Sequence, residues 1–258
     1  MKHLFFLFVL LSFCSFGQNG IYSSDGVLSV EIPVVTDVLL GYPTADELDS
    51  RALDHYNKGT ELIYSLNKTS SDDQKTDQIN QAVDYLIKAI NFDPKFVQAY
   101  DNLGKAYRML NNYDLAIESY EISLKIFPKG RSAHQNLAVV YQKQKNWNKA
   151  ITEYEILINM SPQSPEGYYG LANVYQKISK LNLALSNAFK ALELYKQNPT
   201  NYIGDSYGQI GLIYYYKGNN LKAKEYIQIA KEKYISNNFE SVFYATFPES
   251  LLKELSID

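Results

Sequence analysis

Cysteine, histidine and long apolar runs are all scarce in this chain of 258 residues. Cys14 is the single cysteine, so disulfides within the chain and Cys-ligated metal sites are excluded. Beyond residue 3 the histidines are His55 and His134, which leaves few groups for acid–base catalysis. No apolar run approaches the roughly 20 residues that a membrane-spanning helix needs. The fold must therefore depend on packing within a water-exposed protein.

Charge is nearly balanced, with 25 Lys and Arg against 28 Asp and Glu. The net charge of -3 argues against a dedicated nucleic-acid binder, which would show a basic balance or a basic face. Gly and Pro are also few, at 13 and 8, and 46% of the residues are hydrophobic. A folded chain is expected, with no nucleic acid among its partners.

The first 17 residues have the pattern of a secretory signal peptide. Lys2 and His3 precede an unbroken apolar run over 4–11, and small residues follow near Gly17. Cleavage after Gly17 is expected. The chain would then be exported, to the periplasm or the cell envelope.

Cys14 leaves an alternative open, because Leu11-Ser12-Phe13-Cys14 has the outline of a bacterial lipoprotein signal. Such signals place a small residue before the cysteine, whereas Phe13 is large. We therefore expect a mature protein without lipid, and a lipid anchor at Cys14 is the alternative.

A 34-residue period organises most of the remaining chain, with repeats starting at Val97, Arg131, Pro165 and Gly204. Four repeat positions carry the same residue types, namely Leu103, Leu137, Leu171 and Ile210 at position 7; Gly104, Ala138, Ala172 and Gly211 at 8; Tyr107, Tyr141, Tyr175 and Tyr214 at 11; and Ala116, Ala150, Ala184 and Ala223 at 20. Positions 4, 7, 8 and 11 form one helical face, and 17, 20, 24 and 27 form a second. Small residues at 8 and 20 allow two antiparallel helices to approach closely. Each repeat is therefore a helical hairpin.

These residues closely resemble the tetratricopeptide repeat family, over about 97–237. The resemblance implies an all-α fold, a right-handed superhelical solenoid of about five hairpins closed by a C-terminal capping helix. Position 32 departs from the family, since Lys196 and Ile235 replace the proline found at Pro128 and Pro162. Longer second helices are expected in the last two repeats.

The rest of the chain completes this organisation. We expect a signal peptide over 1–17, an extended N-terminal segment over 18–45, a repeat array over 46–241 and a C-terminal cap over 242–258. The array begins with a degenerate repeat, 52–96, whose two helices are separated by a long polar connection. In the cap, Leu251, Leu252 and Leu255 form an apolar stripe after Pro248, which suits a first helical turn.

Groups that could perform chemistry do not converge anywhere in the sequence. We expect His134, at the bulky position 4, to pack in the core and His55 to be solvated. Ser71-Asp72-Asp73 is expected to be a solvated turn, with weak calcium binding as the alternative. No phosphate loop, nucleophile turn or metal motif is present, so no enzyme activity, cofactor or metal is expected.

The family resemblance implies that first helices line a concave groove, through positions 2, 5, 9, 12 and 13. Partner-binding candidates carried over from these positions are Asp101, Lys105, Arg108, Gln135, Lys143, Tyr169, Asn173, Lys177, Gly208, Leu212, Tyr215 and Tyr216. The small Gly208 suggests room for a ligand side chain. Two alternatives stay open: these residues are solvated helix faces, or the C-terminal segment covers Tyr215 or Tyr216.

One family subtype is excluded, because the basic residues that clamp a terminal carboxylate are replaced by Asp101, Glu166 and Gly170. We therefore expect an exported scaffold that binds a protein or peptide partner in its groove. The alternative is a structural subunit of a cell-envelope assembly or secretion complex.

Overall fold

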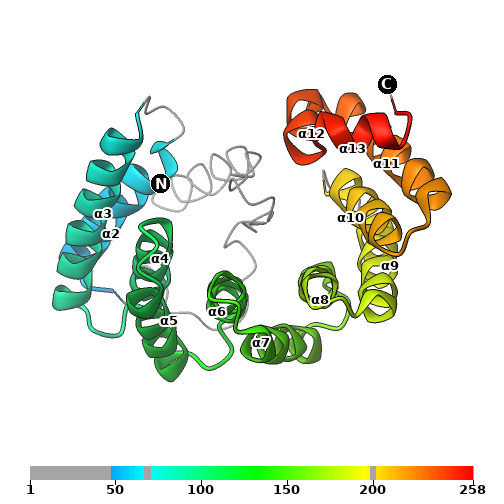
Figure 1. Cartoon of the computed structure of the whole chain (residues 1–258). Coiled ribbons are helices and arrows are strands. Elements are labelled where there is room, and N and C mark those ends of the chain that lie inside the picture. The colour runs from blue at the N-terminus through cyan, green and yellow to red at the C-terminus, as the bar shows by residue number, and fades with distance from the viewer. Residues whose placement is uncertain (1–47, 67–70, 198–201, 258) are drawn as a thin grey trace, which may run out of the picture. The chain divides into compact units, whose positions relative to one another are not determined.

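The computed structural model describes residues 48–66, 71–197 and 202–257, and every regular element in these ranges is a helix (Figure 1). The expected signal peptide, its cleavage site and the extended segment over 18–45 lie outside the described residues. The chain forms two compact units, which meet in sequence between Gln144 and Lys145. The first unit holds α2 (Ser50–Tyr64), α3 (Asp72–Phe92), α4 (Val97–Met109), α5 (Tyr113–Ile126) and α6 (Arg131–Lys143). The second unit holds α7 (Trp147–Met160), α8 (Pro165–Lys177), α9 (Leu181–Gln197), α10 (Ile203–Tyr216), α11 (Asn220–Ser236), α12 (Glu240–Thr246) and α13 (Glu249–Glu254).

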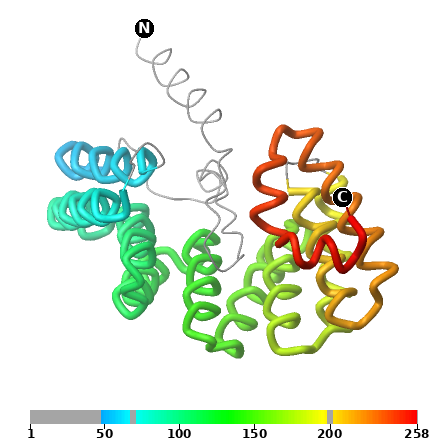
Figure 2. The backbone as a smooth tube through the Cα atoms, turned by 45° about the horizontal axis from the view of Figure 1, so that its top comes forward, coloured from blue at the N-terminus to red at the C-terminus, as the bar shows by residue number. Residues whose placement is uncertain are grey.

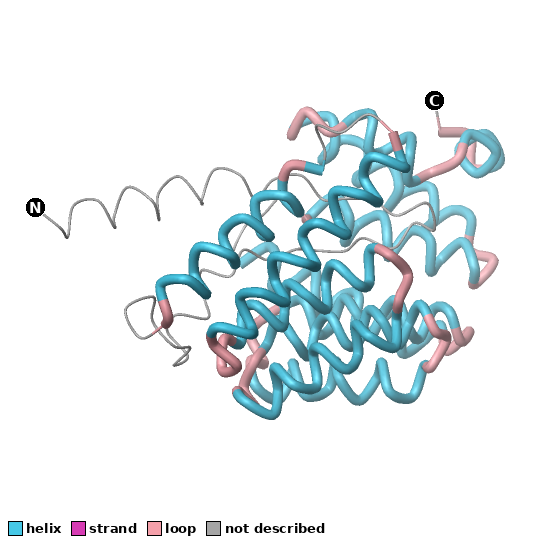
Figure 3. Tube along the Cα trace, turned by 90° about the vertical axis from the view of Figure 1, so that its left-hand side faces the viewer, coloured by secondary structure: helices cyan, strands magenta, loops and turns pink. Residues whose placement is uncertain are grey.

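Within the units, α2 with α3, α4 with α5, α8 with α9, and α10 with α11 pack as antiparallel hairpins, which confirms the predicted fold class (Figures 1 and 3). The small residues at positions 8 and 20 stand at the helix crossings. A Cβ atom on Gly104 would lie 2.7 Å from the Tyr120 ring, and one on Gly211 would lie 2.6 Å from Ile227 Cγ1. The position-20 alanines Ala116 and Ala223 are fully buried. Larger side chains at these positions would push the two helices of a hairpin apart.

In the four regular repeats, the turn between the first and second helix has one residue in the left-handed conformation at repeat position 15. These residues are Asn111, Lys145, Ser179 and Gly218, with φ between 57° and 73°. The turn also satisfies carbonyl groups at the end of the first helix, since Lys180 N–H donates to Tyr175 O at 2.8 Å and Asn219 N–H to Tyr214 O at 2.9 Å. This is the hydrogen-bond pattern of a helix that ends in a left-handed residue.

Proline sets the length of the second helices. The helices α5 and α7 have 14 residues each and end shortly before Pro128 and Pro162. The helices α9 and α11, which lack that proline, have 17 residues each. The prediction of longer second helices in the last two repeats is confirmed. The reason is that proline disfavours the helical conformation in the residue before it.

The degenerate first repeat is a hairpin of α2 and α3, which run side by side in Figure 2. One expectation was wrong here, because Asp72 and Asp73 belong to a helix and not to a turn. Ser71 caps α3, with its Oγ accepting from Gln74 N–H at 3.2 Å. The two aspartates occupy the first turn, where the helix dipole favours negative charge. Their position thus has a structural explanation.

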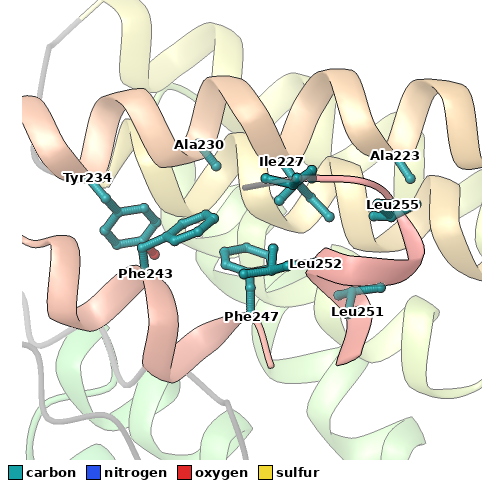
Figure 4. Close-up of a cluster of buried hydrophobic side chains, with 10 residues drawn as sticks. Ala223, Ile227, Ala230, Tyr234, Phe243, Phe247, Leu251, Leu252 and Leu255 are labelled. Atoms are coloured by element: carbon teal, nitrogen blue, oxygen red, sulfur yellow. The ribbon is translucent and has the colours of Figure 1, made fainter. Parts of the chain in front are cut away.

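The C-terminal cap consists of two short helices, α12 and α13, instead of one. Pro248 lies between them at the N-cap of α13. Phe243 and Phe247 from α12 and its end, together with Leu251, Leu252 and Leu255, pack on the side of α11 that presents Ile227, Ala230 and Tyr234 (Figure 4). Phe243 and Phe247 are at most 1% exposed. The cap therefore covers the apolar face that a further repeat would otherwise bury.

Candidate partner-binding faces

The first helix α8 shows how a candidate face arises from repeat spacing. Gly167 and Gly170 face α7, where added Cβ atoms would meet Ile158 and Tyr154. Ala172 packs in a cluster with Ala184 and Ala188 of α9. The remaining side of α8 carries Tyr169, Asn173 and Lys177, spaced four residues apart, of which Lys177 is exposed and the other two are half-buried. These three predicted residues share one helix face.

In the first unit, two of the candidates on α4, Asp101 and Lys105, interact with other residues of that unit. The Asp101 carboxylate is 8% exposed and accepts a hydrogen bond from Ser123 Oγ at 2.5 Å. The Lys105 ammonium, also on an 8% exposed residue, lies 4.6 Å from the centre of the Tyr64 ring. Asp101 therefore links α4 to α5, a structural role that the sequence analysis missed.

The other first-unit candidates are more accessible. Arg108 on α4 and Gln135 and Lys143 on α6 are half-buried. Arg108 and Lys143 each lie in the last turn of their helix, where a cation is favourable. Their long side chains can carry charge away from the packed core.

Amide side chains at repeat position 6 connect neighbouring repeats. Gln209 Nε2 donates to Asn173 Oδ1 at 2.8 Å and to Tyr169 O at 3.1 Å. In the first unit, Asn102 Nδ2 donates in the same way to Tyr56 Oη and Thr60 Oγ1, both at 3.1 Å. The sequence signal was present, as an amide at position 6, but nothing in one sequence identified its acceptors.

On α10, the cap occupies the predicted face. A Cβ atom on Gly208 would lie 2.5 Å from Phe247 Cζ, so the expected room for a ligand side chain is filled. Leu212 packs against the same cap cluster. Tyr215 Oη donates to Glu254 Oε2 at 2.8 Å, and this hydrogen bond raises the pKa of Tyr215. The alternative, that the C-terminal segment covers this face, is the correct one for Gly208, Leu212 and Tyr215.

Tyr216 differs from its neighbours on α10. It is 61% exposed, and its ring meets the Tyr215 ring edge-on at 5.8 Å between centroids. It is the α10 candidate that the cap leaves accessible to solvent.

His55 and His134, the histidines among the described residues, both lie in packing contacts. His134 is 9% exposed, and its Nε2 atom lies 3.4 Å from Pro128 O, which confirms the expected packing. His55 is not solvated as expected, because its ring stacks on Phe92 at 5.4 Å and on Tyr85 at 6.0 Å. Among the described residues no three Asp, Glu, His or Cys side chains gather as a metal site would require. None of the described helices is long and apolar enough to cross a bilayer.

Models of the tetratricopeptide repeat match the chain three times, over 97–129, 143–179 and 204–231. The chain is a member of the tetratricopeptide repeat family. The matches at 97 and 204 start at the predicted repeat boundaries. The one over 143–179 spans a second helix and the following first helix, so it is shifted by half a repeat.

Solved tetratricopeptide structures show the same fold at low sequence identity. MamA from Desulfovibrio magneticus RS-1, residues 41 to the end, superposes with a TM-score of 0.59 at 18% identity, over 73% of this chain and 98% of MamA. TTC0263 from the thermophile Thermus thermophilus gives 0.58 at 15%, over 76% and 97%. YrrB, described as a tetratricopeptide repeat protein with an unusual peptide-binding site, gives 0.51 at 20%, over 74% and 90%. No curated protein sequence matches the chain.

Proposed function

We propose that this protein is an exported scaffold that binds a protein or peptide segment through the first-helix faces of its repeats. The observation that carries the proposal is the Tyr169–Asn173–Lys177 face of α8. These residues combine an aromatic ring, an amide and a cation at four-residue spacing on α8, whose small residues Gly167, Gly170 and Ala172 are the ones that pack on α7 and α9. Aromatic and cationic side chains are enriched where protein interfaces concentrate their binding energy.

Two further observations support a binding role. The chain belongs to a family of interaction scaffolds, and YrrB is described as having a peptide-binding site on the same fold. The described residues also lack a metal cluster, and His55 and His134 are held in packing contacts. We therefore propose a scaffold without catalytic activity.

The candidate face is narrower than the sequence suggested. Gly208, Leu212 and Tyr215 are under the cap, and Asp101 is bonded to Ser123. We place the partner on Tyr169, Asn173 and Lys177 of the second unit. Gln135, Lys143 and Arg108 are separate candidates on the first unit. A polar or amphipathic segment suits these side chains better than an acidic tail, because they present both amides and cations.

Site-specific photocrosslinking in the native cell tests the face. A benzoylphenylalanine at Lys177, exposed on α8, should form an adduct with one partner. The matched control is the same residue at Glu155, exposed on the second helix α7. Adducts at 177 and none at 155 support the proposal, and adducts at 155 alone contradict it.

The alternative function is a structural subunit of a cell-envelope assembly or secretion complex. It predicts adducts through the second helices, and cofractionation with a membrane complex. Affinity purification of the tagged protein from its own envelope distinguishes the scaffold from the structural subunit. A scaffold should be recovered with its partner, and the double variant Tyr169→Ala, Lys177→Ala should be recovered without it.

A further inference from the structure

The first unit has an acidic patch around one core tyrosine. Tyr107 of α4 is half-buried between α3 and α5, and the nearby carboxylates are Asp84 of α3 and Glu118 of α5, both exposed. Burial raises the pKa of Tyr107, and the charges of Glu118 and Asp84 raise it further, so both carboxylates act on the same phenol. We call Asp84, Tyr107 and Glu118 the acidic patch.

The second unit has a basic patch at the corresponding place, where α10 lies between α9 and α11. The Tyr226 ring of α11 lies 5.5 Å from Tyr214, 6.2 Å from Tyr207 and 5.9 Å from Phe189. Lysines stand over this aromatic group at both ends.

The first of these lysines, Lys196, has its Nζ 5.3 Å from the centre of the Tyr207 ring, and the second, Lys222, has its Nζ 5.0 Å from Tyr214. Both residues are exposed. Cations held over aromatic faces keep their charge at the surface in a fixed place. The basic patch is Phe189, Lys196, Tyr207, Tyr214, Lys222 and Tyr226.

The net charge of the second helices also changes from negative in the first unit to positive in α9 and α11, in agreement with the two patches. The helices α3 and α5 each carry more acidic than basic residues, with four against two and three against one. The helix α9 has Lys190 and Lys196 against Glu193, and α11 has four lysines against Glu225 and Glu232. The second helices of the first unit are thus acidic on balance, and α9 and α11 of the second unit are basic on balance.

We propose that the basic patch docks on the acidic patch of a second copy of this chain. The two patches match in construction, because each surrounds the position-11 tyrosine of a first helix, and they are opposite in charge. Complementary charges favour encounter and fix the register of an interface. The contact uses different surfaces on the two copies, so it is heterologous and adds further copies at either end.

Charges of the other sign also lie near each patch and limit its strength. Glu225 is next to Tyr226 and contributes to its raised pKa, and Glu193 pairs with Lys190 at 3.1 Å. Lys88 lies on α3 one turn after Asp84, with its Nζ over the Tyr85 ring at 5.3 Å. A weak, salt-dependent association is therefore expected, since exposed ion pairs are screened by salt.

Sedimentation equilibrium of the purified full chain measures the association at low and high salt. At low ionic strength the weight-average mass should rise with concentration above that of one chain, and at high ionic strength it should return toward one chain. Replacing Lys196→Glu and Lys222→Glu should weaken association more than about tenfold, because like charges then face each other. Asp84→Lys and Glu118→Lys should do the same.

Mixing the two reversed variants gives the decisive result. One variant has two acidic patches and the other two basic patches, so each alone should be monomeric and a mixture should associate. The control for the lysine replacements is Lys129→Glu with Lys145→Glu, which changes the net charge by the same amount and sign at exposed sites outside both patches. All four substituted patch positions are exposed, and circular-dichroism melts should be unchanged.

Several outcomes would overturn the proposal. They are a monomer at all concentrations in low salt, reversed variants that associate as well as the wild type, and a mixture that stays monomeric. Binding of an acidic peptide or of DNA to the basic patch of a strictly monomeric chain would likewise assign the patch to another partner. None of these results bears on the α8 face, so the proposed function is tested separately.

Discussion

The ring of Phe247 lies directly against the backbone of Gly208, so that a Cβ atom at 208 would come within 2.5 Å of Phe247 Cζ. These residues are far apart in sequence, and the contact fixes the cap on the first helix of the last repeat. The cap also packs on α11, through Phe243 and Leu252. It thus covers two faces of the last hairpin.

The first prediction concerns this contact. Gly208→Ala should lower the free energy of unfolding by about 1–3 kcal/mol, because the new methyl group overpacks against Phe247. Gly204→Ala, on the same helix, is the control, since its Cβ would come no closer than 3.3 Å to Tyr234. Urea unfolding of both variants measures the difference. Equal stability of the two would show that Phe247 does not occupy this place.

Helix crossings provide the second prediction. Ala150→Leu should destabilise the protein by about 1–3 kcal/mol, because Ala150 is fully buried at position 20. Ala245→Leu, at an exposed site on α12, makes the same chemical change without a crossing. Thermal melts compare the two variants. Melting temperatures that fall together would contradict the assigned repeat register.

The left-handed residues at position 15 allow a paired test at two equivalent turns. Gly218→Ala should cost about 1 kcal/mol, because φ is 73° and an L-residue is strained there, although no atom lies within 4 Å of the added Cβ. Ser179→Gly should have the opposite sign, since it relieves the same strain at φ 59°. Denaturant midpoints measure both. A loss of stability in both variants would contradict this explanation.

Alkaline pH should act on the cap through Tyr215. Its hydrogen bond to Glu254 raises its pKa above the ordinary value of 10.0, so the folded protein holds the phenolic proton more tightly than the unfolded chain does. The stabilisation is therefore complete below pH 10 and is lost as the pH rises through the folded-state pKa. Tyr215→Phe should show a smaller loss of stability than the wild type between about pH 9 and 11. The free energy of unfolding of both proteins, measured across this pH range, tests the prediction. Identical pH profiles for the wild type and Tyr215→Phe would show that Tyr215 does not link pH to stability.

Processing of the amino terminus is tested by intact-mass spectrometry of the native protein. Export with cleavage after Gly17 predicts a chain of residues 18–258 without lipid. A chain that begins at Cys14 and carries acyl groups would instead establish the lipoprotein alternative. An unprocessed amino terminus would contradict both.

The periodic part of the fold could be predicted from sequence because its causes are local. Small residues at positions 8 and 20 specify a close helix crossing, and Pro128 and Pro162 limit the second helices. These signals recur in phase, so each repeat supports the assignment of the others. Neither the small residues nor the prolines require knowledge of a contact between residues distant in sequence.

The candidate site was less predictable, because contacts between residues distant in sequence determine which of the candidate side chains stay accessible. Gly208 has the spacing of a groove residue, yet Phe247 fills the space beside it. Asp101 likewise has the right position, but Ser123 turns its carboxylate toward α5. His55 is polar and lies on a helix surface, yet Phe92 stacks on it. Repeat positions specify a direction from the helix, whereas the covering side chains lie 22 to 39 residues away.

The amide of Gln209 gives the α8 face a connection to the cap end of the protein. Asn173 Oδ1 accepts from Gln209, so a ligand that competes for the Asn173 amide must replace that bond or leave Gln209 Nε2 with Tyr169 O as its one remaining acceptor here. Occupancy of α8 and the rigidity of α10 are then thermodynamically coupled, and the coupling is reciprocal. A partner bound to Asn173 would therefore change the amide hydrogen-exchange rates of α10, even though the partner contacts no residue of that helix.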